Sequence, residues 1–187
     1  MKNIIQIRTI SRPIGFLQSM GLAVSIFLGS AVIGAILRLH IHVSAPPIDK
    51  PYTLTAMDVF VVNSRILLVL VLGGFVLAIP TVLSLMLNGI GFGSIVIAIL
   101  DGGSLRSVVL TLGPHGLFEL PAVWLAGGVG IHISHRVLAY CVGRTDSPID
   151  RQYGQLWLGM VLVAIGLAGI GAVIEITITP WIASKIL

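Results

Sequence analysis

The sequence predicts an all-α fold, a polytopic transmembrane helical bundle of about five spans, and three observations lead to this prediction. Of the 187 residues, 56% are hydrophobic and only 10% are charged, whereas a water-soluble domain carries roughly a quarter charged residues. The mean hydropathy is +1.06. The apolar residues also come in long runs, and a run of about 18 or more is long enough to cross the hydrocarbon core of a bilayer.

The basic residues indicate a membrane surface rather than a nucleic acid. They are scattered over the ends of the apolar runs, as topology signals are, and they form no basic stripe. The lone cysteine, Cys141, cannot form an internal disulfide and belongs to no metal-binding motif. The first apolar run, 14–37, is too long for a cleavable signal and is followed by no small-residue cleavage site, so it is expected to remain as a span.

The apolar runs place spans at about 14–37, 66–87, 89–105, 116–135 and 156–179, within one integral membrane domain of residues 1–187. A proline-rich extramembrane loop follows the first span. At its end, Thr55 and Asp58 resemble a capping box that opens a short interfacial helix. Pro80 is expected to kink the second span. The third segment is short for a crossing, and a re-entrant hairpin is the alternative.

Charge bias favours five crossings over four. Two groups of basic residues are expected in the cytoplasm by the positive-inside rule. An even number of crossings must separate them, so 89–105 is predicted to span. This predicts a multi-pass protein of the cell membrane with a cytoplasmic N-terminus. The two groups are Lys2, Arg8 and Arg12 in the N-terminal tail, and Arg136, Arg144 and Arg151 before the last span.

The stretch GPHGLFELPAVWLAGGVG at 113–130 contains the most unusual chemistry of the chain. His115 and Glu119 are four residues apart and share one face of a helix. Pro114 suits the first position of a helix, with Gly113 as its N-cap. Pro121 then removes a further backbone hydrogen bond. We therefore predict a broken helix at 113–121, which must be buried in protein or line a wet cavity.

Ionisable side chains inside a membrane are costly and indicate a functional site by default. His115 and Glu119 are interpreted in two ways. Either they bind a proton, an ion or a polar ligand group, or they form a structural lock between helices, which is the favoured interpretation because polar groups often join helices in lipid. Glu175 is expected to snorkel or to pair with Arg65 or Arg106. Small-residue faces at 125–130 and 166–172 predict tight helix packing, within the protein or in a homodimer.

No metal, cofactor or catalytic site is predicted. The histidine pairs His40/His42 and His132/His135 fall on opposite sides of the bilayer, and two ligands are too few for a zinc site. The zinc-protease helix, the nucleophile elbow and the phosphate-binding loop are missing from the sequence. An intramembrane hydrolase that uses His115 and Glu119 for acid–base work is a third alternative, but no nucleophile accompanies the pair.

Three segments resemble the stage II sporulation protein M family of integral membrane proteins: LNGIGFG at 87–93, PHGLFELPAVWLAGGVG at 114–130 and IEITITP at 174–180. Asn63 also falls where the family tends to have asparagines. The resemblance implies a small helical protein of about five spans. It marks eight positions as candidate site residues, which are Asn88, Gly89, Pro114, His115, Gly116, Glu119, Pro121 and Glu175.

The resemblance also implies a role. In endospore formers the sporulation member helps to localise cell-wall hydrolases to the septal membrane, and it is not known as an enzyme. The expectation is therefore a non-enzymatic scaffold that recruits membrane or envelope protein partners. It would lie in the lipid bilayer as a homo-oligomer, a dimer, without nucleic acid. The alternative is a permease, a channel-like protein or the membrane subunit of a transporter that uses the intramembrane His/Glu site.

Overall fold

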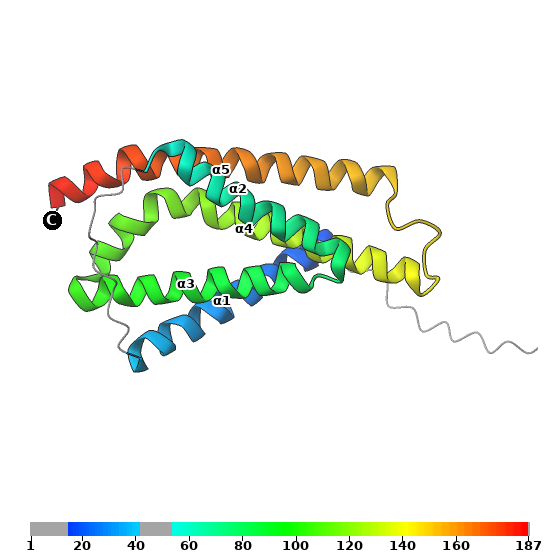
Figure 1. The fold of residues 1–187 in the computed structure, drawn as a ribbon, viewed down its shortest axis with the longest axis horizontal. Helices are drawn as coiled ribbons and strands as arrows, with labels where there is room; N and C mark the ends of the chain where they lie inside the picture. The colour runs from blue at the N-terminus through cyan, green and yellow to red at the C-terminus, as the bar shows by residue number, and fades with distance from the viewer. Residues whose placement is uncertain (1–14, 42–53, 187) are drawn as a thin grey trace, which may run out of the picture.

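The chain folds into a bundle of long helices (Figure 1). The computed structural model describes residues 15–41 and 54–186; the N-terminal charges, His42 and most of the proline-rich loop lie outside these ranges. Five described helices are long and apolar enough to cross a membrane, so the predicted all-α, five-span class is confirmed. In order, the elements are α1 (Phe16–His40), α2 (Ala56–Leu72), η1 (Gly73–Val76), α3 (Ile79–Gly102), α4 (Leu105–Cys141) and α5 (Arg151–Ile186).

The predicted second span, 66–87, is wrong, because it runs across a tight hairpin between two helices. Helix α2 begins ten residues earlier, at the predicted capping box. The Thr55 hydroxyl oxygen accepts from the Asp58 backbone N–H at 3.2 Å, and the Thr55 N–H donates to the Asp58 carboxylate at 2.9 Å. The box is confirmed, but it opens a membrane-length helix instead of a short interfacial one.

The hairpin between α2 and α3 is built from apolar residues in an uncommon backbone conformation. Leu77 and Ala78 have φ values of 53° and 57°, a region that side chains other than glycine rarely adopt. Pro80 lies in the first turn of α3, where its missing N–H costs nothing, so it does not kink a span. The Thr81 hydroxyl donates to the Leu70 carbonyl oxygen at 2.8 Å and satisfies an end of α2.

The third predicted segment is neither short nor re-entrant. Helix α3 runs over 24 residues, enough for a full crossing. It packs against α1 at very close range through glycines. A Cβ atom placed on Gly34 would overlap the Ile90 carbonyl oxygen, and one on Gly93 would overlap the Ala31 carbonyl oxygen. The Ser94 hydroxyl donates to the Gly34 carbonyl at 3.1 Å, so backbone contact and a hydrogen bond join the two helices.

Helix α4 is the central helix of the bundle. Half of its most apolar 18-residue window is buried, against 17–28% in the other four spans. The small-residue segment 126–130 lies fully inside, which confirms tight packing there. The predicted break at 113–121 is wrong: the helix stays continuous through Pro114 and Pro121, and its N-cap is Ser104 rather than Gly113. Figure 1 shows that the first turns of α4 rise from the end of α3 before the helix bends along the bundle.

The ends of the helices divide into two groups. The start of α1, the α2–α3 hairpin and the α4–α5 loop lie at one end of the bundle, and the C-terminal end of α5 lies at the other (Figure 1). An even number of crossings therefore separates the start of α1 from the α4–α5 loop, as the charge argument required. Arg136, counted as a loop charge, lies inside α4.

Candidate functional site

A cavity of about 410 Å³ opens between α2, α3 and α4, beside residues 112–123 of α4. Four polar side chains line it, and each comes from a position that the sequence singled out. Asn63 stands on α2, Asn88 on α3, and His115 and Glu119 on α4. The rest of the lining is mostly apolar and contains no serine, cysteine, lysine or arginine among the described residues. The structure thus brings together residues that are up to 56 positions apart in the sequence.

Glu119 is fixed from two sides. Its Oε1 atom accepts a hydrogen bond from the Asn63 side-chain amide at 2.7 Å, which joins α4 to α2. Its Cγ atom packs over Gly171 of α5, where a Cβ would lie 2.6 Å from it. A larger residue at this position would displace the Glu119 side chain and disturb its hydrogen bond to Asn63.

His115 makes its hydrogen bond to a different helix. Its Nδ1 atom lies 3.3 Å from the Thr179 hydroxyl oxygen of α5. The same hydroxyl donates to the Ile174 carbonyl at 3.4 Å. When the Thr179 hydrogen is directed to Ile174, the hydroxyl accepts from His115 and Nδ1 carries the proton. His115 and Glu119 share one face of α4, as predicted. His115 joins α4 to α5, whereas Glu119 joins α4 to α2.

Asn88 and Gly89 are neighbours in sequence with different surroundings. The Asn88 amide donates to the Ser84 carbonyl of its own helix at 2.7 Å, and its side chain faces the cavity. Gly89 lies on the α1 side of α3, where an added Cβ would overlap the Phe27 carbonyl oxygen. Gly89 therefore serves helix packing rather than the cavity.

The remaining candidates do not converge on the cavity as a group. Gly116 lines it, whereas Pro114, Pro121 and Glu175 do not. The two prolines lie within α4, near its bend. Glu175 is half-buried on α5 and forms no ion pair with Arg65 or Arg106, so that predicted pairing is wrong.

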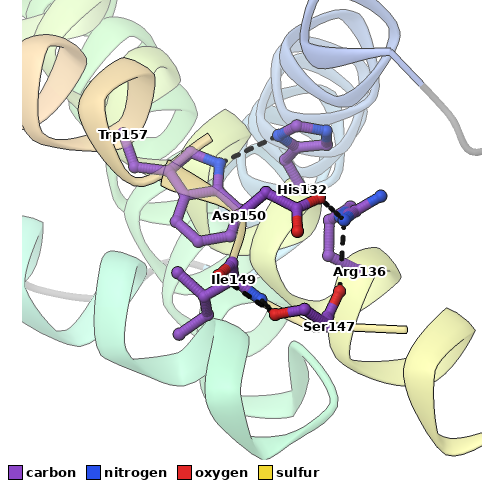
Figure 2. Close-up of polar contacts among 6 residues, drawn as sticks. All are labelled: His132, Arg136, Ser147, Ile149, Asp150 and Trp157. Carbon is purple, nitrogen blue, oxygen red and sulfur yellow. Dashed lines mark hydrogen bonds and ion pairs between the residues drawn. The ribbon is translucent and has the colours of Figure 1, made fainter. Parts of the chain in front are cut away.

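A second polar cluster ties α4 to α5 and to their connecting loop (Figure 2). The Trp157 indole N–H donates to His132 Nδ1 at 2.9 Å, and both side chains are buried. Arg136, one turn further along α4, is only 4% exposed. It forms an ion pair with Asp150 at 2.5 Å and donates to the Ser147 carbonyl at 3.2 Å.

This cluster shows how His132 is used. Because its Nδ1 accepts from Trp157, that nitrogen is unprotonated and already occupied. His132 is also in edge contact with the Tyr153 ring, and the Arg136 guanidinium lies 4.3 Å from the centre of that ring. Among residues 15–41 and 54–186, no group of three or more metal-ligating side chains comes together.

Two contributors to the site were missed at the level of sequence. Thr179 lies in the IEITITP segment, but nothing distinguishes it there from Thr177, which bonds to its own helix. Gly171 lies in a glycine-rich face that predicted packing without naming Glu119 as the group packed against it. Asn63 was named only through the family resemblance and was placed before the second span, and its partner became clear only when α2 and α4 were placed together.

The spanning helices and the polar side chains buried between them define a multi-pass helical membrane protein. The chain belongs to the stage II sporulation protein M family, whose sequence model matches residues 18–180. It is also similar to an uncharacterized protein of Methanocaldococcus jannaschii, with 28% identity over 126 residues, or 67% of this chain and 71% of that protein. No solved structure matches the chain.

Proposed function

We propose that this protein is a non-enzymatic scaffold of the cell membrane, with a cytoplasmic N-terminus, that recruits membrane or envelope protein partners through its helices. Membership of the stage II sporulation protein M family supports this proposal, because that family is not a known enzyme family. The cavity lining supports it too, since it offers no nucleophile among the described residues to accompany His115 and Glu119. The single observation that carries the proposal is the position of Arg65.

Arg65 is exposed on α2, about 13 Å along the helix from Ala56. No ion pair with another described residue involves it. Val62 and Val69, which lie on the same helix face, are 54% and 45% exposed. A charged group on a lipid-facing surface is costly, and a neighbouring helix with an acidic side chain would offset this cost. This face therefore fits a membrane helix of a partner, and a second copy of the chain is one such partner.

Replacing Arg65 by leucine is expected to abolish partner recovery. The variant, the wild type and Arg65→Lys would be purified from native membranes after cross-linking, and the bound proteins identified by mass spectrometry. Arg65→Lys should retain the partners because it keeps the charge. Arg106→Leu, which removes an exposed arginine at the start of α4, is the matched control. Recovery of the same partners with Arg65→Leu, or of a lone monomer with the wild type, would contradict the proposal.

The cavity favours a second candidate function, that of a permease, a channel-like protein or the membrane subunit of a transporter. Polar groups from three helices meet inside the span, which is a common arrangement at the substrate sites of transporters. Under this hypothesis, Glu119→Gln should lower solute flux in proteoliposomes at least about tenfold, because a charged hydrogen-bonding group is lost. Equal flux in variant and wild type, or none in either, would reject it.

A further inference from the structure

The cavity presents more free hydrogen-bond acceptors than free donors. The Asn88 amide nitrogen donates to the Ser84 carbonyl oxygen at 2.7 Å and to the Ser84 hydroxyl oxygen at 3.4 Å, so its donors are directed to its own helix. One N–H of the Asn63 amide donates to the Glu119 carboxylate at 2.7 Å, and the amide keeps its second N–H. Both amide oxygens remain without a hydrogen bond from the described residues. The second carboxylate oxygen of Glu119 likewise receives no hydrogen bond from the described residues.

His115 adds a further acceptor. In one tautomer Nδ1 donates to the Thr179 hydroxyl, which in turn donates to Ile174. In the neutral imidazole the other ring nitrogen, Nε2, then carries a lone pair. Four side chains on three helices therefore offer acceptor atoms, against a single N–H, that of Asn63, which is left to donate.

The charge of the lining also favours a cation. Glu119 is the acidic residue of the cavity, and no lysine or arginine among the described residues lines it. A carboxylate within a membrane needs a compensating charge. The rings of Phe27 and Phe92 also line the cavity, with their centres 5.8 Å apart, and aromatic faces attract cations.

The volume distinguishes an organic cation from a bare metal ion. About 410 Å³ lies within the range of pockets that hold small organic ligands, and it exceeds the space that a single ion needs. Apolar side chains such as Ile66, Ile95 and Leu112 supply walls for a hydrocarbon body.

We propose that this cavity binds a small primary ammonium group attached to an apolar body. The N–H groups would donate to Glu119, Asn63 and Asn88, and the body would pack against the phenylalanines. A free amine and the headgroup of an aminolipid share this chemistry. The inference goes beyond the scaffold role and does not depend on it, since binding can occur without partners and without flux.

Butylammonium is the probe that tests the proposal, with binding measured by calorimetry and thermal shift on the purified full chain in detergent. Three controls isolate each element of recognition: butanol lacks the charge, butyrate reverses it, and tetramethylammonium keeps it without N–H donors. Butylammonium is expected to bind at least about tenfold more tightly than each of them, because hydrogen bonds to a charged group contribute most of the difference. Nanodiscs of phosphatidylethanolamine, compared with phosphatidylcholine, would show whether a lipid ammonium competes for the site.

The variants test the site rather than the fold. Glu119→Gln keeps an oxygen for Asn63 but removes the charge, and should weaken butylammonium binding at least about tenfold. Asn88→Ala removes only a bond within its own helix and should weaken binding severalfold. Asp146→Asn changes an exposed acid of the α4–α5 loop and should bind as the wild type does. Equal binding of butanol, or unchanged binding by Glu119→Gln, would overturn the proposal, and binding without any flux would reject the permease hypothesis alone.

Discussion

Replacement of Gly93 by valine is expected to disrupt the bundle. Gly93 is buried where α3 crosses α1. A Cβ at this position would overlap the Ala31 carbonyl oxygen and lie 2.7 Å from the carbonyl carbon. Both atoms belong to the backbone of α1, so no side-chain rotation can make room. The helices would have to move apart, which would also separate Gly34 from Ile90 and weaken the hydrogen bond of Ser94.

The expected loss of stability from this change is more than about 3 kcal/mol, because overpacking alone costs 1–3 kcal/mol when side chains can adjust. That is a large part of the 5–15 kcal/mol that holds a typical domain together. The loss would appear as reduced protein in the membrane and as a lower melting temperature in detergent, measured by fluorescence-detected size-exclusion chromatography.

Gly91→Val is the matched control for this experiment. Gly91 lies on the same helix, and a Cβ there meets nothing within 4 Å. Both variants introduce the same β-branched residue into a helix interior, so they share any effect of helix propensity. Similar melting temperatures for the two variants would show that α1 and α3 do not approach as closely as the structure indicates.

The close crossing of α1 and α3 also shows where sequence reasoning reached its limit. The hydropathy pattern predicts the correct number of spans, five. It assigns the end of α2 and the start of α3 to one span, however, because the apolar run continues through the hairpin. Leu77 and Ala78 adopt left-handed backbone conformations without the glycine or asparagine that signals a turn. From the sequence, Pro80 could either kink a span or lie in the first turn of a helix. Only the position of the hairpin distinguishes these two roles.

The candidate site was predictable in part. The four-residue spacing of His115 and Glu119 correctly placed both on one face of α4, and both line the cavity. The two prolines suggested a break, but packing around the central helix keeps it continuous. The hydrogen-bond partners were beyond reach, because Asn63 and Thr179 come from helices whose relative rotation depends on the packing of the whole bundle.

Removal of the Asp150 carboxylate is expected to destabilise the α4–α5 connection strongly. Arg136 is almost completely buried, and Asp150 is its ion-pair partner at 2.5 Å. In Asp150→Ala the guanidinium would keep only the Ser147 carbonyl and the Tyr153 ring. An uncompensated buried charge costs 3–5 kcal/mol. Because the Asp150 side chain is 44% exposed, solvent screens part of this loss, and we expect about 2 kcal/mol.

Two further variants separate the cost of the unpaired charge from the loss of a surface carboxylate. Asp146→Ala removes an exposed acid of the same loop and should leave the melting temperature unchanged. Arg136→Met combined with Asp150→Ala removes both charges and should recover part of the stability lost in Asp150→Ala, because a buried pair can be replaced by apolar side chains at little cost. If the double variant is as unstable as the sum of its single changes, the guanidinium contributes by packing on Tyr153 rather than by its charge. If Asp150→Ala has the same melting temperature as Asp146→Ala, the ion pair does not hold the loop to α4.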